Sequence, residues 1–207
     1  MPSSPKIQKE VILNTALEIL IHEGYSAINI KRIAGELGCS TQPISWQFGG
    51  MDGFRKELAE YAMSYAQKKM IPASDNFVAA FAQSGQAYID LAIDEPNLFR
   101  FVFMGESGSS AEGGFEKFLS FDRNIMMMQG LMELLHITQE QANAFMNTMI
   151  IYTHGMASLI ASGIVKEDKE TAHRMVVETG ISYLRSFGLS EAQIQKLFQP
   201  QSEHDLP

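Results

Sequence analysis

Residues 29–48 have the sequence NIKRIAGELGCSTQPISWQF, in which two short helical patterns flank a turn. Asn29 is a favourable N-cap, and apolar residues at helical spacing follow it as far as Gly38, which can take the left-handed conformation that ends a helix. Ser40 is expected to cap the next helix, with Pro43 in its first turn, where the missing N–H costs no intrahelical bond. Two short helices joined in this way predict a helix-turn-helix.

Helical periodicity extends from this stretch toward both ends of the chain, and no segment is typical of a β-strand. Ile12, Ala16 and Leu20 recur at helical steps over residues 6–23, and Gly24 supplies the stop. Further helices are expected over residues 52–70, 74–93, 95–104, 114–135, 138–163, 167–187 and 190–198. The sequence therefore predicts an all-α protein that begins with a three-helix helix-turn-helix domain.

The composition and the distribution of charge narrow the class of protein. The chain has 207 residues and a single cysteine, Cys39, which excludes an intramolecular disulfide and a cysteine-rich zinc site and predicts a cytoplasmic protein. Residues 1–70 carry eight basic and seven acidic groups, whereas the rest of the chain has a net charge of −9. Any contact with nucleic acid is therefore expected in the first third, because the acidic remainder repels phosphates.

One uncharged stretch has the length of a membrane span. Residues 141–165 contain no Asp, Glu, Lys or Arg. The same stretch contains Asn143, Asn147 and His154, whose polar groups are costly against lipid. We therefore expect a helix buried between protein surfaces and no membrane partner.

A set of residues at fixed spacing gives the N-terminal region a family likeness. The set joins a helical run to a Gly-Tyr pair, the glycine of the turn and a closing phenylalanine: Ile12–Leu20, Gly24-Tyr25, Ile30–Ala34, Gly38-Cys39-Ser40 and Phe48. Over about residues 8–60 this pattern resembles the N-terminal domain of TetR-type transcriptional repressors. Two later segments, Glu95–Arg100 and Tyr152–Ala157, resemble parts of the variable C-terminal domain of that family.

The resemblance implies a fold, a set of partners and a function. It implies an all-helical homodimer whose third helix enters the major groove of double-stranded DNA at an inverted-repeat operator. It also implies a helical ligand-binding and dimerisation domain, in which a small-molecule effector weakens DNA binding by a repressor. The corresponding boundaries are a helix-turn-helix domain at 1–50, an effector-binding and dimerisation domain at 51–198, and a flexible tail at 199–207.

The exposed side of the second helix of a helix-turn-helix reads base edges in the major groove. Gln42 and Gln47 have amides suited to the N6 and N7 edge of adenine, and Thr41 suits a base edge or a thymine methyl. Phosphates are expected to contact Lys31 and Arg32, together with Lys6, Lys9 and backbone N–H groups at helix N-termini. The complete set of expected DNA-contacting residues is Asn29, Lys31, Arg32, Ser40, Thr41, Gln42, Pro43, Ser45, Trp46 and Gln47.

Three positions depart from the family pattern. Family members often carry Lys, Tyr and Lys where this chain has Thr41, Ser45 and Met51, so the usual phosphate contacts are missing. Residues 40–48 contain no charged side chain, which predicts a low non-specific affinity and a shallow salt dependence. Trp46 is expected to make the phosphate contact that tyrosine makes in other family members. The alternative is that Trp46 and Gln47 only pack on the surface of the domain.

The expected helix over 138–163 is apolar on two sides, with one stripe through Phe145 and Met149 and another through Met146. The helix expected over 167–187 repeats this pattern. A helix that is apolar on both sides needs two burial partners, so one side is expected to cover its own core and the other to meet a two-fold partner. The alternative is a thicker core in a monomer.

Aromatic and methionine side chains concentrate between residues 77 and 156. Because methionine adapts to irregular apolar shapes, a pocket lined by these side chains suits a small apolar or aromatic ligand. Tyr88 and His154 are expected to provide polar anchors for that ligand. The same residues are also consistent with an ordinary core, and His154 with a core or seam histidine. The candidate ligand-binding residues are Phe81, Tyr88, Phe99, Phe103, Phe118, Met127, Phe145, Met149, Tyr152 and His154.

The sequence gives little support for catalysis. Its five histidines lack metal-ligand spacing and no nucleophile elbow is present, so we expect no catalytic residue, no metal and no cofactor. Asp90, Asp94 and Glu95 are interpreted as solvated surface, and Cys39 as a packing residue. Two other functions stay open: a small-molecule-binding helical protein whose DNA binding is weakened or lost, and a helical enzyme that uses the apolar cavity.

Overall fold

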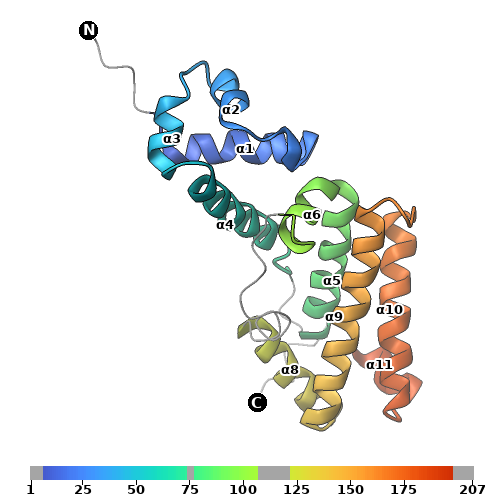
Figure 1. Ribbon diagram of the computed structural model, residues 1–207. Coiled ribbons are helices and arrows are strands. Elements are labelled where there is room, and N and C mark those ends of the chain that lie inside the picture. The colour runs from blue at the N-terminus through green and yellow to red at the C-terminus, as the bar shows by residue number, and fades with distance from the viewer. Residues whose placement is uncertain (1–6, 74–76, 107–121, 198–207) are drawn as a thin grey trace. The chain divides into compact units, whose positions relative to one another are not determined.

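The computed structural model describes residues 7–73, 77–106 and 122–197, and every regular element in these ranges is helical (Figure 1). The predicted all-α class is therefore confirmed, and most expected helix ends lie within a few residues of the observed ones. The elements are α1 (Lys9–Glu23), the short 3-10 helix η1 (Tyr25–Ala27), α2 (Ile30–Glu36), α3 (Gln42–Phe48), α4 (Met51–Lys69), α5 (Phe77–Asp94), α6 (Pro96–Phe103), α8 (Asp122–Leu135), α9 (Gln139–Ala161), α10 (Lys169–Ser186) and α11 (Glu191–Leu197).

Some predictions fall on parts of the chain that lie outside the described residues. These are Lys6, Phe118, the start of the helix expected over 114–135, and the tail at 199–207. Met127 lies in α8, but its side chain also lies outside the described part. Within the described ranges, no helix combines the length and the apolar character that crossing a bilayer requires.

The helices form two compact units. The first unit consists of Met1–Lys69 and Leu91–Ser110, and the second of Met70–Asp90 and Ala111–Pro207. The helix α5 belongs to both, because its last turn from Leu91 onward counts with the first unit. The first unit is thus assembled from two separate stretches of the sequence.

Local signals in the helix-turn-helix are largely confirmed, with one correction. The Asn29 side chain caps α2 by accepting a hydrogen bond of 2.9 Å from the Arg32 N–H, and Gly38 has the left-handed φ of 60°. Ser40 does not cap α3, so that prediction is wrong. The helix begins one residue later than expected and Thr41 takes the cap position, in an αR conformation and without a side-chain cap hydrogen bond.

Helix α6 completes the core of the first unit by packing on α1 and α4 (Figure 1). Leu98, Phe99 and Phe101 of α6 are all fully buried. Asn97 of the same helix donates a hydrogen bond of 3.0 Å from Nδ2 to the carbonyl of Ile21, next to the end of α1. The apolar side of this short helix therefore lies against the helices that support the helix-turn-helix.

Glu95 precedes α6 and is largely buried, with 13% of its side chain exposed, so its interpretation as solvated surface is wrong. Its Oε1 accepts a hydrogen bond of 3.1 Å from the Tyr65 hydroxyl and forms an ion pair with Lys69. Its Oε2 is buried and has no hydrogen-bond partner among the described residues. Burial lowers the pKa of Lys69, but the hydrogen bonds to Glu95 and Tyr65 outweigh it and raise that pKa overall. These contacts fix the start of α6 to α4.

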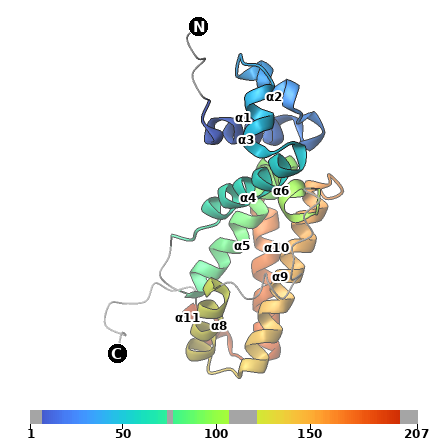
Figure 2. The same ribbon diagram turned by 60° about the vertical axis from the view of Figure 1, so that its left-hand side comes forward.

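In the second unit, α9 and α10 run side by side and α8 packs on α9 (Figure 2). A capping box formed by Thr138 and Gln141 begins α9, and the Asp168 carboxylate caps α10 through the Thr171 N–H at 2.7 Å. Apart from Thr153, the buried residues of α9 come from both predicted stripes; the complete set is Ala142, Phe145, Met146, Met149, Thr153, Ala157 and Ala161. Apolar side chains remain exposed on another face, at Ile151 and Leu159.

Candidate nucleic-acid interface

The recognition helix α3 has one buried side and one exposed side. Ile44 and Phe48 are 0% and 6% exposed, and the Phe48 ring contacts the Phe54 ring of α4 edge to face, at 5.1 Å between centroids. On the other side, Gln42 is exposed and the Trp46 indole is 76% exposed. The helix therefore presents polar and aromatic side chains from a rigid apolar base.

Gly53 lies in the first turn of α4, where the backbone of α3 approaches closely. A Cβ on Gly53 would lie 1.9 Å from the carbonyl oxygen of Phe48, so no side chain fits there. We did not identify this glycine from the sequence. The available signal was an isolated glycine inside a helical pattern, which often indicates a close backbone approach.

The chain ahead of α1 is attached to the recognition helix. Gln47 donates a hydrogen bond of 3.0 Å from Nε2 to the backbone carbonyl of Ile7. Lys9 lies with its Nζ 4.9 Å from the centre of the Phe48 ring and forms an ion pair with Glu57 at 2.5 Å. Two residues expected to contact DNA thus have partners within the protein.

The expected phosphate-contacting residues at α2 lie on the surface. Lys31 is exposed, and Arg32 forms ion pairs with Glu23 at 2.8 Å and Glu36 at 2.9 Å. Exposed pairs of this kind contribute little to stability, so Arg32 can exchange these carboxylates for a phosphate at low cost. Among the other members of the predicted set, Asn29 caps α2, Ser40 and Thr41 lie in the turn between α2 and α3, and Pro43 and Ser45 lie on α3.

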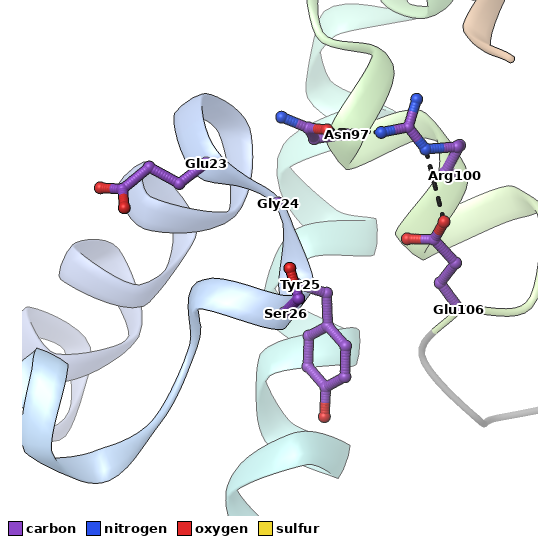
Figure 3. Close-up of a pocket in the computed structure, with 7 residues that line it drawn as sticks. All are labelled: Glu23, Gly24, Tyr25, Ser26, Asn97, Arg100 and Glu106. Carbon is purple, nitrogen blue, oxygen red and sulfur yellow. Dashed lines mark hydrogen bonds and ion pairs between the residues drawn. The ribbon is translucent and has the colours of Figure 1, made fainter.

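A polar hollow of about 380 Å³ also lies in the first unit, at the end of α1 and beside α6 (Figure 3). Arg100 donates to the Asn97 side chain at 2.5 Å and pairs with Glu106 at 3.3 Å. The positive charge is thereby compensated within the hollow, which differs from the apolar lining expected for an effector site. The residues that line it are Glu23, Gly24, Tyr25, Ser26, Asn97, Arg100 and Glu106.

The structure divides the candidate effector residues between the two units. In the second unit, the Phe145 ring lies 5.8 Å from the Phe81 ring and 6.0 Å from the Tyr183 ring. Phe99 and Phe103 belong to the first unit, where their rings contact each other at 5.2 Å. The members of the predicted set that belong to the second unit are Phe81, Tyr88, Phe145, Met149, Tyr152 and His154.

A polar chain crosses the apolar part of the second unit. The Tyr88 hydroxyl lies 2.8 Å from His154 Nδ1, and His154 Nε2 lies 3.4 Å from the Ser158 hydroxyl. Burial raises the pKa of Tyr88 far above its ordinary value and lowers the pKa of His154. Burial therefore favours the neutral form of each of these side chains.

This burial of His154 predicts a pH dependence of stability. Because the folded-state pKa lies below the unfolded value of about 6.5, the unfolded chain binds more protons between the two values. The free energy of unfolding is therefore expected to fall as the pH is lowered from about 7.5 to 5.5. Urea unfolding of the His154→Gln variant should show a smaller fall, whereas Tyr88→Phe should retain it; an unchanged fall in His154→Gln would contradict this assignment.

Within the described ranges, no group of His, Cys, Asp and Glu side chains is placed to hold a metal ion. The Asp90 carboxylate lies 2.8 Å from His173 Nε2 and 3.9 Å from Lys169 Nζ. These contacts join α5 to α10 within the second unit and have a structural explanation.

Comparisons with known proteins show a match to one family model and a similarity in fold to solved structures. A family model described as "Bacterial regulatory proteins, tetR family" matches residues 12–58. The chain is similar to the crystal structure of a TetR variant from Acinetobacter baumannii AYE in complex with minocycline, with a TM-score of 0.55 and 12% identity over 88% of this chain and 97% of that one. It is also similar to the TetR family repressor AlkX from Dietzia sp. strain DQ12-45-1b, implicated in biodegradation of n-alkanes, with a TM-score of 0.41 and 17% identity over 90% and 98%. No curated protein sequence matches the chain. The match over residues 12–58 and the helix-turn-helix together identify the N-terminal region as a DNA-binding domain similar to those of bacterial regulatory proteins of the tetR family, which supports a role of the chain as a DNA-binding transcriptional regulator.

Proposed function

We propose that the protein is a homodimeric repressor that binds an inverted-repeat operator and is released by a small apolar or aromatic effector. The observation that carries the proposal is the exposed side of α3. Gln42 and Trp46 are exposed on α3, as is Thr41 at its cap position, whereas Ile44 and Phe48 on the other side of the helix are buried. Such a helix presents side chains to base edges in the major groove.

Exposed apolar side chains on α9 and α10 support the dimer. Ile151 and Leu159 of α9 are 61% and 43% exposed, and Met175 of α10 is 38% exposed. Side chains of this kind on neighbouring helices favour a self-complementary surface, because a two-fold axis brings the same surface of each copy together. A four-helix seam of two such pairs would cover them.

The effector site is proposed for the second unit. Phe81 and Phe145 provide an aromatic surface, Met149 is adaptable in shape, and the Tyr88–His154 pair offers a neutral polar anchor. A ligand bound there would release the operator if it favoured dimers whose recognition helices are separated by a distance other than about 34–36 Å, the spacing of successive major grooves.

Selection of duplexes from a random pool by the purified protein, followed by titrations at two salt concentrations, tests operator binding. We expect an enriched inverted repeat with half-sites about one helical turn apart. Enrichment of single half-sites only would contradict the dimeric reader.

A second function has support from the uncharged segment at residues 40–48. A chain that lacks phosphate-contacting charge on its recognition helix is also consistent with a small-molecule-binding protein whose DNA binding is weakened or lost. No enrichment at low salt, together with tight binding of an apolar ligand, would favour that function over the repressor.

Gln42→Ala is expected to weaken binding to the enriched duplex by about 1–3 kcal/mol, because a bidentate glutamine–adenine contact is worth that much. Base preference should be lost at only one base pair of each half-site, and the protein should remain a dimer. Gln129→Ala, at an exposed glutamine of α8, is the matched control and should leave binding unchanged. Equal affinities of the Gln42→Ala variant and the unsubstituted protein for the duplex would remove Gln42 from the set of base-reading residues.

A further inference from the structure

Two contacts place one face of α5 opposite α9 in the second unit. The Phe81 ring lies 5.8 Å from the Phe145 ring, and about two turns further along α5 the Tyr88 hydroxyl lies 2.8 Å from His154 Nδ1. Ser84 follows Phe81 by three residues and precedes Tyr88 by four, so these three residues share one face of the helix. Ser84 therefore lies between an aromatic contact and a polar contact, on the face that α5 turns toward α9.

The Ser84 hydroxyl is buried without a partner. Its Oγ has no hydrogen-bond partner among the described residues. Hydroxyls in helices can bond to a backbone carbonyl of the preceding turn, as those of Thr179 and Ser186 in α10 do at 2.8 and 2.6 Å. Since Ser84 does not form this local bond and its Oγ is out of contact with solvent, the hydroxyl carries a desolvation cost. A bound molecule that completes the hydrogen bond would remove that cost.

The two facing segments carry no charged side chain. Residues 77–89 of α5 and 141–161 of α9 contain no Asp, Glu, Lys or Arg. Their polar groups are the Ser84 hydroxyl and the chain from Tyr88 through His154 to Ser158. An ionised group bound between these segments would find no counter-charge on either helix, which makes its burial costly. An uncharged hydroxyl or carbonyl group can instead be satisfied, because a serine hydroxyl both donates and accepts.

We propose that Ser84 is a ligand-contacting residue of the effector site, and that the effector is an uncharged aromatic molecule whose hydroxyl or carbonyl group bonds to Ser84 Oγ. The inference rests on the effector binding proposed above and narrows the class of effector. The Phe81 and Phe145 rings contact the body of the molecule, and Ser84 contacts its polar group. A wholly apolar molecule would leave Ser84 Oγ unpaired, and a carboxylate would be buried without a cation.

Three probes with the same ring system and different polar groups test this assignment. They are 2-naphthol, naphthalene and 2-naphthoate, each measured by equilibrium dialysis against the full-length protein at pH 7. We expect 2-naphthol to bind about tenfold or more tightly than 2-naphthoate. Ser84→Ala should weaken the binding of 2-naphthol by about three- to tenfold, the value of one hydrogen bond, and should change the binding of naphthalene by less than about twofold. Ser182→Ala, at an exposed serine of α10, is the matched control and should bind all three probes as the unsubstituted protein does.

Urea unfolding in the absence of any probe provides a second measurement. Removing a buried hydroxyl that has no partner removes its desolvation cost. The urea midpoint of Ser84→Ala should therefore equal or exceed that of Ser182→Ala, which accounts for the higher helix propensity of alanine. A clearly lower midpoint in Ser84→Ala would show that the protein itself satisfies the Ser84 hydroxyl, and would overturn the proposal.

Three results of the dialysis would also overturn it. They are equal affinities of Ser84→Ala and the unsubstituted protein for 2-naphthol, tighter binding of 2-naphthoate than of 2-naphthol, and absence of binding by all three probes. Failure of the proposed function gives a different result. If 2-naphthol bound in a manner that depends on Ser84 but did not release the protein from its selected duplex, the binding site would stand and its role in effector response would be wrong.

Discussion

Replacing Gly53 by alanine is expected to lower the free energy of unfolding by about 3 kcal/mol. The added methyl carbon would lie 1.9 Å from the carbonyl oxygen of Phe48, well inside contact distance. Because the clashing atom belongs to the backbone at the end of α3, rotation of a side chain cannot relieve the overlap, and α3 and α4 must move apart. That movement would also disturb the Phe48–Phe54 ring contact that supports the recognition helix. We therefore expect operator binding to weaken by about tenfold or more as well.

Urea unfolding and duplex titration measure these two effects. Gly35→Ala is the matched control, since a Cβ on Gly35 in α2 meets no atom within 4 Å. In that exposed helical position alanine should be neutral or should stabilise by up to about 1 kcal/mol. If Gly53→Ala were as stable as Gly35→Ala, the close approach of α3 to α4 described above would be incorrect.

Phe99→Ala is expected to cost about 3–5 kcal/mol of stability, the range for removing a fully buried aromatic ring. Phe99 is 0% exposed and lies on α6, which packs on α1 and α4 in the first unit. The substitution would leave a cavity beneath the helices that support the helix-turn-helix, and would remove the ring contact with Phe103. Phe99 was a candidate effector residue, so this experiment also separates a core role from a binding role.

Thermal or urea unfolding of the purified variant provides the measurement. Met104→Ala, at a residue 38% exposed just after α6, serves as the control and should change stability by less than about 1 kcal/mol. A Phe99→Ala protein as stable as the Met104→Ala protein would contradict the core role of Phe99.

The sequence predicted the parts of this fold that depend on neighbouring residues. Asn29 caps α2, Gly24 ends α1 with a φ of 87°, and Gly38 takes a left-handed conformation, all as expected. Each of these signals acts over one helical turn, through a side chain or backbone conformation specific to one residue type. The prediction that Ser40 caps α3 was wrong because α3 begins one residue later than expected. Periodicity alone does not locate a helix end to within one residue.

Contacts between residues far apart in the sequence were beyond this kind of prediction. The Gln47–Ile7 hydrogen bond and the burial of Glu95 against Tyr65 and Lys69 depend on how helices pack, and the residue types involved are common on surfaces. The sequence likewise did not indicate that Phe99 and Phe81 belong to different units. Both residues lie in segments with helical periodicity, and periodicity does not show which helices pack together. The predicted domain boundaries, the DNA-contacting set and the effector set stay predictions.

The two-part composition of the first unit has a consequence for its biosynthesis. At about 5–20 residues per second, α1 to α4 leave the ribosome seconds before α6 does. During that interval the Tyr25 ring lacks its neighbour Phe101, which lies 4.9 Å away in the finished protein. The nascent chain therefore carries the helix-turn-helix early but with an incomplete apolar support, and the apolar surface that α6 later covers stays open to other contacts during this period.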